Sequence, residues 1–210
     1  MNKENIVFLD TETTGLNVYK EDLMELAIVS LKGKGKRSYL FNKFLKPIVK
    51  CSPGAFDCHQ ITAKMVKNEK HLMYYYDELK QILKDKKIYI YNQNYDVTLI
   101  NSICKRHNKE PLIDLDNCYC IMDDYAIYNG NYNNYHQSFT WVKLTSAFYY
   151  EYDEIKKIIP KCDERNIKAH RALGDCLMSK YIYMAAWEKI QKGINETDEQ
   201  QLYHHYSNKY

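Results

Sequence analysis

The chain has 210 residues, a net charge of +3, 45% hydrophobic residues and 27% charged residues. This length suits one α/β domain that buries a core without staples. No stretch reaches the ~18–20 continuous apolar residues of a membrane span, and the polar start does not resemble a signal peptide. The seven cysteines lack the paired CxxC spacing of a zinc site. We therefore expect a cytoplasmic protein with reduced thiols and no membrane contact.

The first half of the chain predicts three strands in succession. Residues 6–9 form an apolar run that ends in Asp10, which is typical of a buried strand. Residues 23–31 and 38–45 predict two more strands, and two glycines between them favour a turn. We expect an antiparallel meander at the start of a mixed sheet.

The rest of the chain predicts alternating helices and strands. The expected elements are a short helix from Thr62, a helix over 75–83, a strand over 88–91, a helix over 96–107, a strand over 117–120, and helices over 121–128, 141–149 and 169–190. A polar loop is expected over 130–137. The prediction is one domain over residues 1–190 and a polar C-terminal tail over 191–210.

Two carboxylates mark the end of the first strand. Asp10 and Glu12 are two residues apart, so their side chains point to the same face of the strand. Such a pair offers the oxygen ligands that a hard divalent cation prefers, although a solvated strand end has the same pattern. The glycine of the string Asp-Thr-Glu-Thr-Thr-Gly-Leu, residues 10–16, allows a tight turn and close approach of a substrate.

Two more acidic positions lie near predicted helix starts. Asp96 follows a buried strand and opens a helix, where it is either a functional carboxylate or a helix cap. His170 and Asp175 are five residues apart, about 140° around a regular helix. We therefore place His170 in the loop or first turn, with Asp175 pointing inward from the helix. Glu25 is either an additional carboxylate beside this group or an exposed glutamate.

Together, these segments resemble the DEDDh family of 3′→5′ exonucleases. The motifs are Asp-Thr-Glu-Thr-Thr-Gly-Leu at 10–16, Tyr-Asn at 91–92 through Asp96, and His-Arg-Ala-Leu-Gly-Asp at 170–175. Weaker matches are His-Gln-Ile-Thr at 59–62 and Trp-Val-Lys-Leu at 141–144. The second motif departs from the usual His-Asn-Ala, and Tyr95 replaces the usual Phe. The resemblance implies an RNase H-like fold: a mixed five-stranded sheet with antiparallel first three strands, flanked by helices.

The resemblance also implies a mechanism and its residues. Two Mg²⁺ ions, for which Mn²⁺ may substitute, are expected to bind the four carboxylates Asp10, Glu12, Asp96 and Asp175. His170 is expected to act as general base on the attacking water. The expected substrate-binding residues are Thr11, Thr13, Gly15, Leu16, Asn92 and His59. The expected reaction removes nucleoside 5′-monophosphates from the 3′ ends of single-stranded or frayed DNA.

Several alternatives stay open from the sequence. The same scaffold suits an RNA-trimming enzyme, although DNA is favoured, and an inactive nucleic-acid-binding module is a further reading. A polymerase partner is possible but not indicated. The basic residues between Lys32 and Lys50, a run without acidic residues, either contact a phosphate backbone or form a solvated hairpin.

Overall fold

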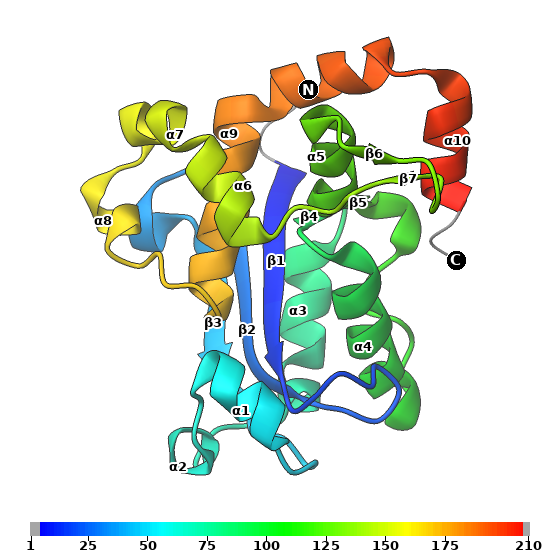
Figure 1. The fold of residues 1–210 in the computed structure, drawn as a ribbon. Coiled ribbons are helices and arrows are strands. Elements are labelled where there is room, and N and C mark those ends of the chain that lie inside the picture. The colour runs from blue at the N-terminus through cyan, green and yellow to red at the C-terminus, as the bar shows by residue number, and fades with distance from the viewer. Residues whose placement is uncertain (1–4, 208–210) are drawn as a thin grey trace.

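The computed structural model describes residues 5–207, and a five-stranded sheet forms its centre (Figure 1). The strands are β1 (Ile6–Thr13), β2 (Leu23–Ser30), β3 (Tyr39–Phe44), β4 (Lys87–Ile90) and β5 (Cys118–Cys120). Their spatial order is β3-β2-β1-β4-β5. The pairs β1–β2 and β2–β3 are antiparallel, whereas β1–β4 and β4–β5 are parallel. The predicted mixed sheet with three antiparallel strands at its start is confirmed.

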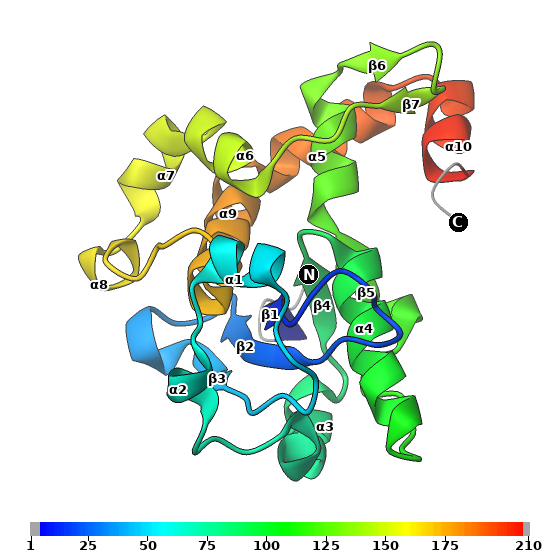
Figure 2. The same cartoon turned by 60° about the horizontal axis from the view of Figure 1, so that its bottom comes forward.

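Helices cover both faces of this sheet, and alternate side chains of β1 pack against each cover. Ile6 and Phe8 belong to one buried cluster, and Val7 and Leu9 to the other, because strand side chains alternate between faces. The first cluster includes residues of α5 (Ile121–Asn129), α6 (Leu144–Tyr150), α7 (Tyr152–Ile158) and α9 (Ala172–Glu196). The second includes residues of α3 (Tyr76–Leu83) and α4 (Gln93–Arg106). Figure 2 shows α9 and α3 on opposite sides of the sheet.

Shorter elements complete the described chain. They are the helices α1 (Pro53–His59), α2 (Ala63–Val66), α8 (Lys161–Glu164) and α10 (Glu199–Ser207), the 3₁₀ turns Gly35–Arg37, Leu72–Tyr75 and Leu115–Asn117, and the hairpin strands β6 (Tyr132–Asn133) and β7 (Ser138–Phe139). The helix α1 was not predicted from the sequence, although Ser52 caps its N-terminus and a proline opens its first turn. The structure contains no candidate membrane-spanning helix within residues 5–207.

The region before α6 differs from the prediction of a helix over 141–149. The helix begins only at Leu144, and Lys143 before it is extended. The carbonyl of Val142 accepts a hydrogen bond from the Tyr91 hydroxyl at 2.6 Å, so a contact with the end of β4 holds this segment outside the helix. The predicted loop over 130–137 contains β6 and the turn of the small hairpin.

The C-terminal segment is a second correction, because residues 191–207 do not form the expected polar tail. The helix α9 continues to Glu196, and α10 follows after a short break. His205 of α10 is only 1% exposed, and its Nδ1 accepts a hydrogen bond from the Phe139 N–H at 3.1 Å. The apolar residues Ile194 and Leu202 pack against a buried cluster of Ala126, Ile127 and Phe139. Ile194 and Leu202 were the sequence features that indicated packing, but the polar residues around them outweighed them in the prediction of a tail.

The basic run between Lys32 and Lys50 is divided by the sheet. Ser30 pairs with Val7 near the start of β1, whereas Glu25 pairs with Glu12 near its end. Residues 31–38 therefore lie at the opposite end of the sheet from the two carboxylates, and residues 43–50 return toward them. The basic residues between Lys32 and Lys50 therefore do not all lie at the end of the sheet that carries the two carboxylates.

Candidate active site

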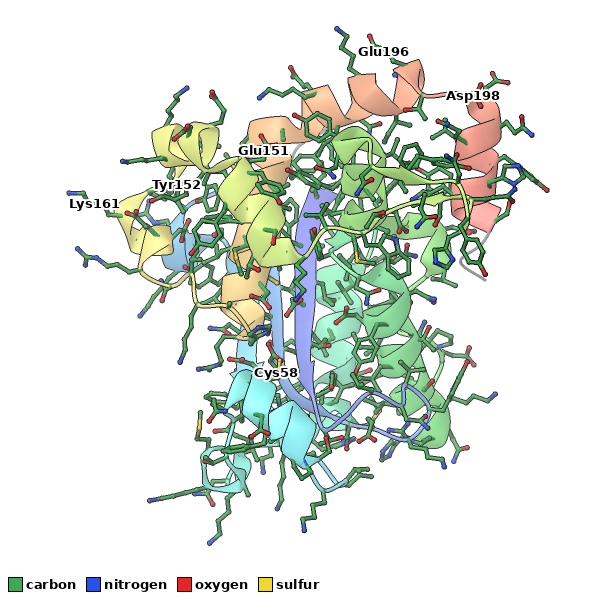
Figure 3. The ribbon with its side chains drawn as sticks, in the orientation of Figure 1. Cys58, Glu151, Tyr152, Lys161, Glu196 and Asp198 are labelled. Atoms are coloured by element: carbon green, nitrogen blue, oxygen red, sulfur yellow. The ribbon has the colours of Figure 1, made fainter. Side chains whose placement is uncertain are left out.

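Three carboxylates converge where β1 meets the start of α9. Asp10 and Glu12 have the same strand parity as Ile6 and Phe8, so they face α9. Asp175 lies in the first turn of α9. One carboxylate oxygen from each of the three residues lies within 4.8 Å of the others. Cys58 of α1, labelled in Figure 3, lies close enough for the charges of Glu12 and Asp175 to add to burial in raising the pKa of its thiol.

Asp96 approaches from the other face of the sheet. Thr11, of opposite parity to Asp10, faces α4, and its hydroxyl donates to Asp96 Oδ1 at 2.5 Å. Asp96 stands in the first turn of α4, whereas Asn92 is the residue at the N-cap. The helix-cap interpretation of Asp96 is therefore wrong, and its carboxylate is oriented by the strand that carries Asp10 and Glu12.

Burial raises the pKa values of all four carboxyl groups. Burial is the largest cause for each, and the neighbouring carboxylates add to it at Asp10, Glu12 and Asp175. The pKa of Glu12 rises to about 8 and those of Asp96 and Asp175 to about 7. Asp175 Oδ1 is buried and has no hydrogen-bond partner within residues 5–207. Converging oxygens with one left unpaired fit a divalent cation, which would neutralise their repulsion.

An ion pair fixes the start of α9. The Arg171 guanidinium donates two hydrogen bonds to Glu25, at 2.9 and 2.8 Å, and the Ala172 N–H donates a third at 3.1 Å. Glu25 is 4% exposed and pairs across the sheet with Glu12, so the exposed-glutamate interpretation is wrong. The guanidinium also lies 4.9 Å from the centre of the Phe44 ring. This pair anchors the helix that carries Asp175 to the strand next to β1.

Gly174 lets the preceding loop close onto the same helix. A Cβ atom at this position would lie 2.1 Å from the Lys168 carbonyl oxygen, so only glycine fits. His170 lies in a turn between Lys168 and the helix, with a φ of 59° in the left-handed region. Its side chain is exposed. The expectation that His170 lies in a loop before the helix is confirmed.

Hydrogen bonds close the loop that follows β1. The Thr13 hydroxyl donates to the Gly15 carbonyl at 2.9 Å, and the Tyr95 hydroxyl donates to the same oxygen at 2.6 Å. Tyr95 Oη also lies 2.8 Å from Thr13 Oγ1. A Cβ on Gly15 would approach the Glu21 carboxylate to 2.8 Å. The tyrosine in place of the family's phenylalanine thus ties the first motif to the second.

The expected substrate-binding residues divide into two groups. The side chain of His59 is 4% exposed, and its Nδ1 accepts a hydrogen bond from the Ile61 N–H at 2.9 Å. Because a neutral imidazole carries its proton on one nitrogen, Nε2 is the donor and bonds to the Thr13 carbonyl at 3.1 Å. Burial lowers the pKa of this imidazole, in keeping with the neutral form. The sequence predicted a substrate contact for His59, whereas in the structure both ring nitrogens bond within the protein. The hydroxyls of Thr11 and Thr13 are likewise buried and bonded within the protein.

The second group remains accessible. Leu16 is 90% exposed at the tip of the loop after β1, which excludes a role in core packing. Asn92 is also exposed, at the N-terminus of α4. The ion pair of Arg171 was not predicted from the sequence, where the residue appeared only as a member of the third motif. Tyr95 was noted as a departure from the usual Phe, and its hydrogen bonds to the first motif are apparent only in the fold.

Comparisons with known proteins agree with this geometry. The exonuclease family model (RNase_T) matches residues 7–183. The uncharacterized exonuclease CP81 of Escherichia phage 186 is 28% identical over 187 residues, covering 84% of this chain and 85% of that protein. The PolC-type DNA polymerase III of Streptococcus mutans is 30% identical over 118 residues, which is 54% of this chain but only 8% of the polymerase.

Solved structures show the same fold. Exonuclease X in complex with 5′-overhanging duplex DNA has a TM-score of 0.54 at 16% identity and covers 95% of this chain and 98% of that chain. E. coli exonuclease I in complex with a dA16 oligonucleotide has a TM-score of 0.63 at 15% identity, covering 94% of this chain and 44% of that chain. On the family match over most of its length, the chain belongs to the exonuclease family, of the DEDDh type, and is an exonuclease enzyme.

Proposed function

We propose that this chain is a divalent-metal-dependent exonuclease that removes nucleoside 5′-monophosphates from the 3′ ends of single-stranded or frayed DNA. The observation that carries the proposal is the convergence of Asp10, Glu12 and Asp175, with Asp175 Oδ1 unpaired among the described residues. Buried carboxylates that lie close together repel one another when they are ionised. Bound cations therefore stabilise a site of this kind. The DNA ligands of exonucleases X and I support DNA as the substrate class.

The residues divide the chemical work as follows. Asp10, Glu12 and Asp175 would hold Mg²⁺ or Mn²⁺, and Asp96, oriented by Thr11, would complete the ligand set. When bound, such ions stabilise the developing negative charge and make water a better nucleophile. His170 accepts the proton of the water that attacks the terminal phosphodiester phosphorus. The bond from phosphorus to the 3′ oxygen breaks, and that oxygen takes a proton from solvent.

The terminal nucleotide is placed by the accessible residues around the carboxylates. Leu16 projects from the tip of the loop after β1 and offers an apolar surface to the last base. Asn92 offers an amide at the start of α4. The terminal base must leave its duplex stack to enter such a site, and unstacking costs a few kcal/mol. Single-stranded and frayed ends are therefore cleaved faster than blunt duplex ends.

End-labelled oligonucleotides test the proposal. Wild-type protein is expected to release mononucleotides from the 3′ end with Mg²⁺, and Asp10→Ala is expected to be inactive but folded. His170→Ala is expected to lose about 10²- to 10⁴-fold in rate, the usual contribution of a general base. His107→Ala, at an exposed histidine after α4, is the matched control. Full activity in excess EDTA, release from the 5′ end, or a strong preference for RNA would contradict the proposal.

A further inference from the structure

A cavity of about 590 Å³ lies between the β6–β7 hairpin and α10. Its wall includes Trp141, the buried ring of Phe139 and the imidazole of His205. Phe139 and His205 pack edge to face at 5.4 Å, and the Phe139 N–H bonds to His205 Nδ1. These contacts hold the hairpin against α10. The volume falls within the range of small-ligand sites, roughly 300–1,000 Å³.

Trp141 is the side chain that gives this cavity its chemical character. It is 57% exposed, so it is not a core residue. Its Nε1–H donates to Asp123 Oδ1 at 3.0 Å, and this bond fixes the orientation of the indole. A fixed indole with a large exposed fraction loses little side-chain entropy when a flat aromatic group stacks on it.

The segment that carries Trp141 is joined to the catalytic end of the sheet. The next residue, Val142, accepts the 2.6 Å hydrogen bond from Tyr91, which directly follows β4. The Tyr91 carbonyl in turn accepts from the N–H of Met122 in α5, the helix that also supplies Asp123. Tyr91 immediately precedes Asn92 and α4, the helix that carries Asp96. A strand whose 3′ end lies among the carboxylates can therefore continue along this rim toward the cavity.

The other groups around the cavity suit a nucleobase. Asn133, Ser138 and Thr140 bring an amide and two hydroxyls, which donate and accept hydrogen bonds as base edges do. Lys143 is exposed two residues beyond Trp141 and offers a cation to a phosphate. Aromatic faces next to a basic residue are the usual components of single-strand binding.

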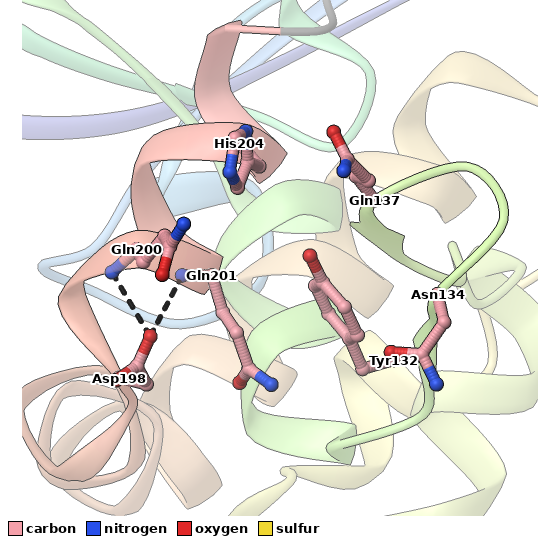
Figure 4. A pocket seen from close by; sticks show the side chains of 7 residues that line it. All are labelled: Tyr132, Asn134, Gln137, Asp198, Gln200, Gln201 and His204. Atoms are coloured by element: carbon pink, nitrogen blue, oxygen red, sulfur yellow. Dashed lines mark hydrogen bonds between the residues drawn. The ribbon is translucent and has the colours of Figure 1, made fainter.

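A second cavity at this corner, of about 270 Å³, differs in that its wall includes a carboxylate (Figure 4). It is lined by side-chain amides, Tyr132, His204 and Asp198. Asp198 Oδ1 accepts hydrogen bonds from the N–H groups of Gln200 and Gln201, at 3.0 and 3.1 Å, and so caps α10. Its negative charge opposes a phosphate backbone, and its contacts explain it as part of the helix start.

We propose that the larger cavity is a nucleobase subsite for the bound strand, upstream of the 3′ end, with Trp141 as its stacking platform. The inference rests on the proposed exonuclease function and adds a second contact to it. The subsite holds the strand between successive cleavages, and it involves α10, which lies beyond the residues matched by the family model.

An abasic scan combined with Trp141→Ala tests this subsite. Stacking is worth a factor of about 5–100 in affinity for one base. In wild-type protein, one abasic position upstream of the 3′ end is expected to weaken binding by that factor. In Trp141→Ala, binding of the intact oligonucleotide is expected to weaken similarly, and the same abasic position is expected to have no further effect. Tyr203→Ala, at an exposed aromatic of α10 that lines neither cavity, is the control.

Fluorescence gives an independent readout. The chain has two tryptophans, and Trp187 packs against Tyr183 at 4.7 Å. In a Trp187→Phe background, titration with a single-stranded oligonucleotide is expected to quench Trp141. Unchanged fluorescence at saturation, or equal abasic penalties in wild type and Trp141→Ala, would overturn the subsite. Wild-type protein that degrades no nucleic acid would instead refute the proposed function, so the two failures are distinguishable.

Discussion

The two halves of the candidate active site are held in place by different means. The loop after β1 is fixed by several hydrogen bonds, from Thr13, from Tyr95 and from His59. The start of α9 is held by Glu25, which accepts hydrogen bonds from Arg171 and from the Ala172 N–H, and by the close backbone contact at Gly174. We therefore expect the first half to tolerate the loss of a single contact and the second half to fail when the Glu25 carboxylate is removed. The half that carries His170 and Asp175 is the more vulnerable to substitution.

The largest effect is expected for Gly174→Ala. The new Cβ would lie 2.1 Å from the Lys168 carbonyl oxygen, so the loop must move away from α9 and carry His170 with it. A displacement of about 1 Å is enough to cost 10²-fold in rate, and the clash is expected to lower stability by about 1–3 kcal/mol. Steady-state kinetics and thermal melts measure the two losses.

Gly193→Ala is the matched control in the same helix. Its Cβ would lie 3.4 Å from the Tyr128 ring, an ordinary contact. Since alanine is the better helix former by up to about 1 kcal/mol, this variant is expected to be neutral or slightly more stable. Equal activity in the two variants would show that the loop before α9 does not depend on Gly174.

The next largest effect is expected for Glu25→Ala. Removing one partner of a buried ion pair usually costs ~3–5 kcal/mol, and the partial exposure of Arg171 reduces this to about 2–4 kcal/mol. Because Glu25 positions the helix that carries Asp175, kcat and the Mg²⁺ dependence of the rate are expected to change more than KM. Urea unfolding and metal titrations of activity measure these effects.

An exposed ion pair supplies the control for Glu25. Lys157 and Glu154 lie 2.8 Å apart on α7, and both are exposed to solvent. Lys157→Ala is expected to leave the midpoint of urea unfolding nearly unchanged, because solvent screens an exposed pair. A Glu25→Ala protein with wild-type kinetics and metal dependence would reduce the pair to a purely structural contact.

The carboxylates where the two halves meet are expected to make the metal-free protein less stable as the pH rises. Folding raises the pKa of Glu12 to about 8 and those of Asp96 and Asp175 to about 7, from ~4 in the unfolded chain. The folded state therefore binds more protons than the unfolded state. The contribution of these groups to the free energy of unfolding is fully present below about pH 4 and is lost as the pH rises through 7–8.

Thermal melts in EDTA at different pH values measure this effect. The melting temperature is expected to fall between pH 5 and pH 8, where these carboxyl groups release protons in the folded state. Added Mg²⁺ is expected to raise the Tm more at pH 8, where the carboxylates are ionised, than at pH 5. The double variant Asp10→Asn, Glu12→Gln is expected to flatten the dependence. Metal-free protein that gains stability toward pH 8 would disprove the electrostatic account.

The smallest effect is expected for Tyr95→Phe, in the better-anchored half. The variant removes one hydroxyl from the Gly15 carbonyl, which keeps its hydrogen bond from Thr13. A loss of about 1 kcal/mol or less is expected, with kcat within a few-fold of wild type. If Tyr95→Phe cost as much as Glu25→Ala, the contrast between the two halves would disappear.

The sequence alone determined the sheet and the positions of the acidic residues. Strand parity put Asp10 and Glu12 on one face, and a five-residue spacing placed His170 outside the helix that carries Asp175. These inferences succeed because they depend on local geometry, which repeats along the chain.

Only the tertiary structure decided how the other polar side chains are used. His59 and Thr11 lie in motifs that predicted substrate contacts, yet packing buried them against backbone and carboxylate partners. Glu25 acquired its role from Arg171, 146 residues away in the chain. The packing of α10 on the hairpin likewise depends on contacts between distant segments, as between Phe139 and His205. A pattern read along one stretch of chain does not contain such pairings, because they are selected by burial and hydrogen-bond satisfaction in the folded molecule.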